Sequence, residues 1–160
     1  MLVGFFMSNT KIQFTADGFK KLQEELEELT KIKRPAAVIR LGKARLMGDL
    51  SENSEYVAAK EDLSFAEGRV REIQEIMRRA EVIDVQTGSG IVIGVDVTVE
   101  RDGNPETYSI VGEFEADPTQ KKLSSTSPIG KALMGKKVGD VVNIEVPAGT
   151  IHYKITKIHK

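Results

Sequence analysis

Acidic side chains gather in a short segment in the first half of the chain. Asp49 and Glu52 stand three residues apart, and Glu55 follows three residues later. Mg²⁺ accepts one or two carboxylates and fills its other positions with water or phosphate oxygens, so this pair is a candidate metal-binding element. The same spacing suits a helix capping box, with Asp49 as the cap and Glu52 at the third position. An acid favoured by a helix dipole stays ionised, so both roles remain open.

Basic side chains precede this acidic segment. No Asp or Glu lies between Glu28 and Asp49. The basic residues of the stretch are Lys31, Lys33, Arg34, Arg40, Lys43 and Arg45. A basic stretch beside an acidic point can hold a phosphate backbone, although basic runs on exposed helices are commonly solvated faces.

The elements that carry these charges are predicted to be helices, because residues 15–80 are rich in Glu, Lys, Arg, Leu and Ala. Apolar residues at alternating steps of three and four predict a coiled-coil seam on the second arm. This seam comprises Tyr56, Ala59, Leu63, Ala66, Val70, Ile73 and Met77. The predicted seam of the first arm comprises Phe19, Leu22, Leu26, Leu29, Ile32, Pro35, Ile39, Gly42 and Leu46. Its two consecutive steps of three predict a stammer, and Pro35 predicts a kink or break.

A short loop joins the two arms. Gly48 is expected to end the first helix, and Asp49 or Ser51 is expected to start the second. The pattern therefore predicts an antiparallel helical hairpin over residues 14–81 with an acidic tip at 48–55. Residues 1–13 are expected to form an N-terminal extension or short lead-in.

Residues 82–160 are rich in Val, Ile, Gly and Thr, which favours β-structure. The predicted strands are 82–85, 91–99, 107–111, 141–146 and 151–158, with a turn at 102–105. A short helix is predicted from Pro128 to Met134, with Ser127 as its cap. The expected fold class is α+β: an antiparallel coiled-coil hairpin followed by an antiparallel sheet domain with one short helix.

Bulk properties exclude several classes of function. The 160 residues carry a formal net charge of −1, which argues against general binding of duplex DNA. The chain has no cysteine, which excludes disulfides and a Cys-based zinc site. No stretch approaches the roughly 20 apolar residues of a membrane span, and the apolar start from Met1 to Met7 is short for a signal peptide. We expect a cytoplasmic protein.

Two motifs resemble those of one known family. Residues 48–56 read GDLSENSEY and resemble the tip motif of the Gre family of transcript cleavage factors. Residues 127–136 read SPIGKALMGK and resemble the C-terminal signature of that family, and residues 80–84 resemble its passage from coiled coil to sheet. The resemblance extends from about Lys11 to Ile158.

The resemblance implies a function for the tip. The hairpin would enter the secondary channel of RNA polymerase and stimulate the polymerase's own cleavage of backtracked RNA. Asp49 and Glu52 match the acidic residues that help hold the second catalytic Mg²⁺ of the polymerase, so they would bind metal only in that complex. The protein would then be a catalytic accessory and not an enzyme, with no cofactor of its own.

The resemblance also implies binding residues. Arg34, Arg45 and Lys60 match the basic patch of the family, which contacts the 3′ segment of the nascent RNA. Lys60 stands where some relatives have Arg, which keeps the charge. The C-terminal domain, FKBP-like in this family, would dock at the channel rim, with Ser127–Gly130 as candidate docking residues. The protein is expected to be a monomer.

Three other functions compete with this interpretation. A Gre-fold inhibitor would occupy the same channel without promoting cleavage, but such homologues have altered tips, and Asp49 and Glu52 are retained here. A peptidyl-prolyl isomerase would need an aromatic-lined pocket, and the sheet region offers only Tyr108, Phe114 and Tyr153. A coiled-coil adaptor would use the acidic tip solely as a capping device.

Overall fold

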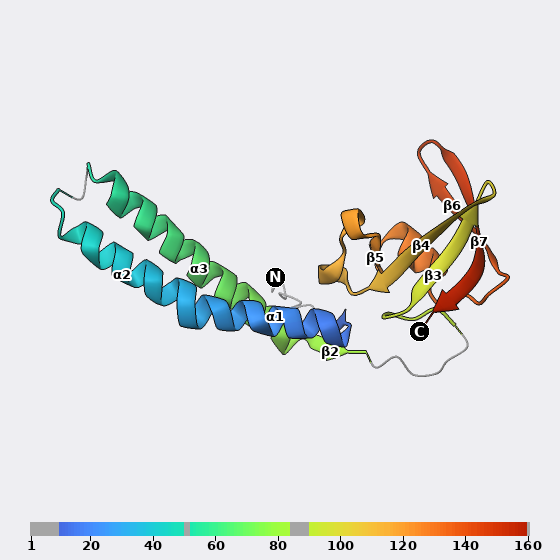
Figure 1. Cartoon of the computed structure of the whole chain (residues 1–160), viewed down its shortest axis with the longest axis horizontal. Coiled ribbons are helices and arrows are strands. Elements are labelled where there is room, and N and C mark those ends of the chain that lie inside the picture. Colours follow the sequence, from blue (N-terminus) through green and yellow to red (C-terminus); the bar gives the residue numbers. More distant parts are fainter. Residues whose placement is uncertain (1–9, 50–51, 84–89, 160) are drawn as a thin grey trace, which may run out of the picture. The chain divides into compact units, whose positions relative to one another are not determined.

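The structure, a computed structural model, describes residues 10–49, 52–83 and 90–159 (Figure 1). It forms two compact units. One unit is the segment Lys20–Arg79, and the other combines the chain up to Phe19 with the chain from Ala80 onward. Residues 1–9 of the expected N-terminal extension lie outside the described residues.

The helical unit is an antiparallel hairpin, as predicted. Its first arm consists of α1 (Ala16–Glu28), the π-helix η1 (Leu29–Lys33) and α2 (Arg34–Arg45), and its second arm is α3 (Ser54–Arg78). Figure 1 shows α2 and α3 lying side by side along their length. The acidic tip therefore lies in the connection between α2 and α3.

The seam on α3 follows the predicted heptads. Ala59, Ala66, Val70 and Ile73 are buried. The remaining predicted seam residues, Tyr56, Leu63 and Met77, are half-buried. The apolar spacing along one regular helix was therefore sufficient to identify the face that packs against the other arm.

The seam on the first arm departs from the prediction after Leu29. Leu22 and Leu29 are buried seven residues apart, but the next buried seam residue, Ala37, comes eight residues later, followed by Ala44 after seven. The extra residue is accommodated by η1, because a π-helix closes its hydrogen bonds over five residues instead of four. The predicted stammer is therefore wrong, and Ile32, Ile39 and Leu46 are 64%, 60% and 88% exposed.

Pro35 does not break the helix. It lies in the first turn of α2, and the residue before that helix, Lys33, keeps right-handed helical dihedrals. Proline cannot donate a backbone hydrogen bond, and the π-helix η1 ends two residues before Pro35. The predicted interruption thus takes the form of a change in hydrogen-bonding pattern within a continuous arm.

The other unit contains a five-stranded sheet in the order β5-β4-β3-β7-β6. Its strands are β3 (Asp96–Arg101), β4 (Asn104–Val111), β5 (Lys122–Ser124), β6 (Val141–Val146) and β7 (Gly149–His159). Two 3-10 helices, η2 (Glu113–Glu115) and η3 (Pro118–Gln120), precede β5, and α4 (Pro128–Leu133) follows it. The α+β class is confirmed. Within this sheet, the β3–β4, β3–β7 and β6–β7 pairs are antiparallel. The edge strand β5, which was not predicted, pairs with β4 in parallel.

One predicted strand begins later than expected. The segment 91–99 alternates apolar residues, but β3 starts only at Asp96. Ile91, Ile93 and Val95 are nevertheless fully buried, and the backbone N–H of Ile91 donates to the carbonyl of Lys136 instead of to a neighbouring strand. The periodicity of buried residues alone does not predict which hydrogen-bond partner a backbone N–H group will have.

The turn between β3 and β4 forms as predicted. Asp102 and Gly103 have φ values of 53° and 80°, and the flanking residues Arg101 and Asn104 pair with each other. Positive φ at both loop residues matches the type I′ hairpin that Asp-Gly favours.

The apolar face of this sheet forms the larger core. The buried cluster consists of Ile91, Ile93, Val95, Val97, Val99, Ile110, Leu133, Val142, Ile144, Tyr153 and Ile155. Leu133 brings α4 onto this face, so the short helix is anchored by a fully buried side chain.

The start of the described chain packs into the same unit. Strand β1 (Ile12–Phe14) pairs in parallel with β2 (Ala80–Val82), and residues 84–85 of the predicted strand lie outside the described residues. The buried Phe14 ring stacks on Phe114, with 6.3 Å between centroids. Glu115 accepts hydrogen bonds from the backbone N–H groups of Thr15 (2.9 Å) and Gly112 (3.0 Å). These contacts hold the segment before α1 in place.

Candidate functional site at the hairpin tip

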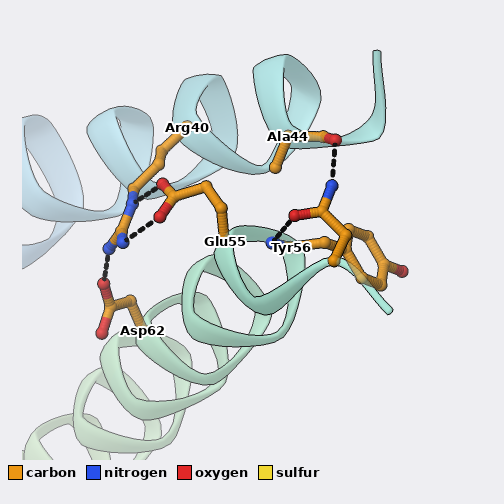
Figure 2. Close-up of polar contacts among 6 residues, drawn as sticks. Arg40, Ala44, Glu55, Tyr56 and Asp62 are labelled. Carbon is orange, nitrogen blue, oxygen red and sulfur yellow. Dashed lines mark hydrogen bonds and ion pairs between the residues drawn. The ribbon is translucent and has the colours of Figure 1, made fainter. Parts of the chain in front are cut away.

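The second arm begins at a cap that differs from the predicted one. Asn53 is the N-cap of α3, and its Oδ1 accepts from the backbone N–H of Tyr56 at 3.1 Å. Its Nδ2 donates to the carbonyl oxygen of Ala44 at 2.9 Å, so the same side chain also holds the end of α2 (Figure 2). The predicted cap at Asp49 or Ser51 is therefore wrong. Asn is as good an N-cap as Asp, and an aspartate has no N–H to offer Ala44.

The two candidate metal-binding acids lie outside both helices. The first arm ends at Arg45, and Gly48, with φ of 128°, turns the chain just before Asp49. Asp49 and Glu52 are exposed. Within the described parts of the chain, Glu52 takes part in no ion pair. Its exposed carboxylate is therefore accessible to a partner.

The third tip acid has a structural role instead. Arg40 donates through Nε to Oε1 of Glu55 at 2.6 Å and through Nη2 to Oε2 at 3.0 Å, and it also contacts Asp62 (Figure 2). This two-point hydrogen bond lowers the pKa of the Glu55 carboxyl below its ordinary value. Glu55 and Arg40 thus connect the arms one turn behind the tip.

The three residues matched to the basic patch lie on one side of the hairpin. Arg34 approaches Glu67 at 3.5 Å, and the Arg45 guanidinium lies 6.0 Å from the centre of the Tyr56 ring. Lys60, which is exposed, follows Tyr56 by four residues and precedes Glu67 by seven, so it shares their face of α3. We call this the basic side.

The opposite side of the hairpin carries balanced charges. Glu55, Asp62 and Arg69 follow each other at intervals of seven residues along α3. Arg40 engages Glu55 and Asp62, and Arg69 engages Glu25 of α1 at 2.6 Å. The hydrogen bond from Arg69 lowers the pKa of the Glu25 carboxyl. We call this the paired side, because its two arginines, Arg40 and Arg69, are matched by carboxylates.

The tip offers the carboxylates of Asp49 and Glu52 as candidate metal ligands. Among the described residues, no group of three metal-ligating side chains comes together. Two carboxylates would leave most positions around Mg²⁺ to other ligands.

Two family models match consecutive parts of the sequence. Residues 12–82 match "Transcription elongation factor, N-terminal", and residues 86–160 match "Transcription elongation factor, GreA/GreB, C-term". The chain belongs to the GreA/GreB family of transcription elongation factors. The boundary between the two matches lies close to the change from the helical hairpin to the sheet.

Individual relatives agree with this assignment. The factor is 46% identical over 154 residues to transcription elongation factor GreA of Rickettsia canadensis, which covers 94% of this chain and 95% of the relative. It is 48% identical over 150 residues to GreA of Thermoanaerobacter pseudethanolicus, covering 91% and 96%.

Solved structures of related proteins are more distant. GreA factor homolog 1 of Thermus thermophilus is 28% identical, with a TM-score of 0.44 and coverage of 94% of this chain and 99% of that chain. The GreA/GreB factor of Nitrosomonas europaea is 19% identical, with a TM-score of 0.42 and coverage of 94% and 100%. The family assignment rests on the sequence matches.

The candidate docking residues of this factor build the start of α4. Oγ of Ser127 accepts from the N–H of Gly130 at 3.0 Å and donates to the carbonyl oxygen of Ser124 at 2.7 Å. A Cβ on Gly130 would lie 1.9 Å from that same oxygen. Ile129 packs against the sheet core, and Pro128 is exposed. Local structure therefore accounts for three of the four residues.

Sequence reasoning missed the structural roles of two side chains near the tip of the factor, Asn53 and Arg40. A signal for Asn53 was present, because Asn directly before Ser-Glu is a good helix start. Arg40 carried no local signal, since its partners Glu55 and Asp62 lie on the other arm.

Among the described residues, no helix of the factor is long and apolar enough to span a membrane.

Proposed function

We propose that this factor inserts its hairpin tip into the secondary channel of RNA polymerase and stimulates the polymerase's cleavage of backtracked RNA. The observation that carries the proposal is the placement of Asp49 and Glu52. Both are exposed and stand outside the helices, in the connection between α2 and α3. A pair of carboxylates at the end of a hairpin can reach a metal that another protein holds.

The tip residues would supply two ligands to Mg²⁺ in the polymerase active site. When bound there, Mg²⁺ activates water and stabilises charge on the phosphate. Asp49 and Glu52 would raise the occupancy of that metal by adding negative oxygens to an incomplete site. Asn53 would hold the tip in a defined position, because its amide joins the end of α2 to the start of α3.

The basic side would bind the extruded 3′ segment of the RNA. Arg34, Arg45 and Lys60 lie on that side, and Arg and Lys side chains are the usual partners of phosphates. The Arg45–Tyr56 and Arg34–Glu67 contacts are surface interactions of small net strength. The two guanidinium groups can therefore turn to RNA at little cost.

The factor would act through the polymerase and not as an enzyme. Two carboxylates make a poor Mg²⁺ site in free solution, so no nuclease activity is expected without the polymerase. The factor would need no cofactor of its own and would act as a monomer in the cytoplasm. The sheet unit would dock at the channel rim, with the exposed Pro128 and its neighbours Ser127, Ile129 and Gly130 as the docking segment.

The test uses purified polymerase stalled on a template with a backtracked RNA. The doubly substituted factor Asp49→Asn/Glu52→Gln keeps the size of both side chains but removes both charges. We expect at least a tenfold lower cleavage rate, with partial recovery at high Mg²⁺, because only the metal affinity is weakened. Glu61→Gln is the matched control, since it removes an exposed acid from α3 behind the tip.

Two outcomes would contradict the proposal. Cleavage by the doubly substituted factor at the unsubstituted rate would support the adaptor function, in which the tip charges have no chemical role. Binding of the unsubstituted factor without any RNA shortening, at every Mg²⁺ concentration, would support the inhibitor. The retained Asp49 and Glu52 favour the cleavage factor.

A further inference from the structure

The basic side continues beyond the three residues matched to the family patch. Farther from the tip, a surface hollow is lined by Arg34, Glu67, Val70, Arg71 and Gln74. Gln74 follows Glu67 by seven residues, so it lies on the same face of α3, and Arg71 lies between them. The hollow therefore borders the basic side and shares Arg34 with it.

Arg71 differs from the other arginines of this part of α3. Arg69 is engaged by Glu25 and Glu72, and Arg78 is engaged by Glu75 at 2.6 Å. Arg71 is exposed and, in the part of the chain that the structure describes, belongs to no ion pair. Its Nη2 lies 4.0 Å from the position that a Cβ would take on Gly68, one turn nearer the tip.

We propose that this hollow binds the extruded RNA beyond the family patch, with Arg71 on a phosphate and Gln74 on a base edge or a ribose hydroxyl. The proposal rests on the cleavage function above. A guanidinium offers two parallel donors that match a phosphate. A side-chain amide both donates and accepts, as contacts to the polar edges of a single strand require.

The Arg34–Glu67 contact allows the hollow to open to a ligand. At 3.5 Å between Nε and Oε1, with both side chains partly exposed, this pair is weak. Arg34 can therefore exchange Glu67 for a phosphate. The hollow would then present two guanidinium groups and one amide, with Val70 at its floor and Glu67 as its single acid.

Position along the hairpin gives the proposal a specific consequence. Lys60 and Arg71 are separated by eleven residues, which corresponds to about 16 Å along a helix. Arg71 therefore contacts RNA only when the extruded segment is long enough to pass Lys60. A short extruded segment would meet Arg45 and Lys60 alone.

The first experiment compares polymerase complexes that carry a short or a long extruded RNA. For the long RNA, we expect Arg71→Ala to raise the concentration of factor needed for half-maximal cleavage about three- to tenfold. Loss of one phosphate contact on a single strand should also lower the slope of log affinity against log salt by about 0.7. For the short RNA, Arg71→Ala should behave like the unsubstituted factor.

Lys43→Ala is the matched control for the loss of one positive charge. Lys43 is exposed and follows Arg40 by three residues, so it lies on the paired side of the hairpin. We expect it to act equally on the short and the long RNA. Equal behaviour of Arg71→Ala and Lys43→Ala on the long RNA would overturn the proposal, because it would reduce the role of Arg71 to general charge.

The second experiment locates the RNA directly. The factor has no cysteine, so a single Gln74→Cys substitution can carry a photoreactive label. We expect this label to crosslink to the 3′ segment of the long RNA, and we expect a label at Glu72→Cys, on the paired side at the same level, to do so much less. Crosslinks from position 74 to polymerase protein instead of RNA would overturn the proposal.

These measurements separate the proposal from the function on which it rests. If the unsubstituted factor stimulates no cleavage, the proposed function fails. If it stimulates cleavage but Arg71→Ala has the same activity and salt slope on the long RNA, only the RNA-binding hollow fails. If the salt slope falls and position 74 crosslinks to RNA, both stand.

Discussion

The side-chain amide of Asn53 donates to the carbonyl oxygen of Ala44 at 2.9 Å, which links the second arm of the hairpin to the last turn of the first. Its Oδ1 simultaneously caps α3 at Tyr56. One residue therefore caps the start of α3 and adds a second hydrogen bond to the Ala44 carbonyl, which also accepts from the backbone N–H of Met47 at 3.2 Å. Asp49 and Glu52 both precede Asn53, in the connection between α2 and α3.

This double contact predicts graded effects of substitution. Asn53→Ala removes both hydrogen bonds and should lower the free energy of unfolding of the hairpin by about 1–2 kcal/mol. Asn53→Asp keeps the cap but loses the bond to Ala44, so its effect should be smaller. Urea unfolding followed by circular dichroism measures both. Equal stability of Asn53→Ala and the unsubstituted protein would show that the cap is not formed in solution.

The register of the first arm predicts a contrast between two nearby residues. Leu41 is buried in the seam, whereas Ile39 is 60% exposed. Leu41→Ala should cost about 2 kcal/mol or more, because it leaves a cavity between the arms. Ile39→Ala should change stability by less than about 0.5 kcal/mol. Chemical unfolding of both variants decides the register, and the reverse order would restore the heptad read from the sequence.

The Arg40 contacts predict a dependence of hairpin stability on pH. Arg40 lowers the pKa of the Glu55 carboxyl in the folded state through a direct hydrogen bond. The stabilisation is therefore fully present above the unfolded pKa of Glu, about 4.3, and is lost as pH falls through the lower folded value. Helix content measured against urea at neutral and acid pH should show this loss.

Arg40→Ala should weaken that pH dependence, because Glu55 then titrates nearly alike in both states. Lys43→Ala, three residues later on α2, is the control and should leave the dependence unchanged. Added salt should reduce the effect of Arg40, since the pair is exposed to solvent. An identical acid transition in both variants would contradict the role of Arg40.

The close packing at α4 predicts a structural penalty at Gly130. An added Cβ would lie 1.9 Å from the carbonyl oxygen of Ser124, so the backbone would have to move. Gly130→Ala should destabilise the sheet unit by about 1–3 kcal/mol. Lys131→Ala, an exposed change in the same helix, is the control. A fully stable Gly130→Ala protein that binds polymerase weakly would instead assign Gly130 to docking alone.

The sequence by itself determined the α+β class, the hairpin, the seam on α3, the turn at Asp102–Gly103 and the helix at Ser127. Each of these depends on a pattern within one continuous segment of the chain. Apolar spacing marks the buried face of a regular helix, and Asp-Gly favours positive φ wherever it stands. The candidate acids Asp49 and Glu52 were likewise found from their own spacing and from a motif.

Only the tertiary structure decided the register of the first arm, the cap of α3 and the two sides of the hairpin. The π-helix adds one residue to the first arm, and Ala37 and Ala44 are therefore the residues buried in the seam with α3. No local sequence pattern predicts this extra residue. Asp, Ser and Asn are similarly good N-cap residues. Asn53 differs from the other two candidates because its side-chain N–H also donates to the carbonyl oxygen of Ala44 on the other arm. The separation of a basic from a paired side arises in the same way, because contacts between distant residues determine which charges remain available.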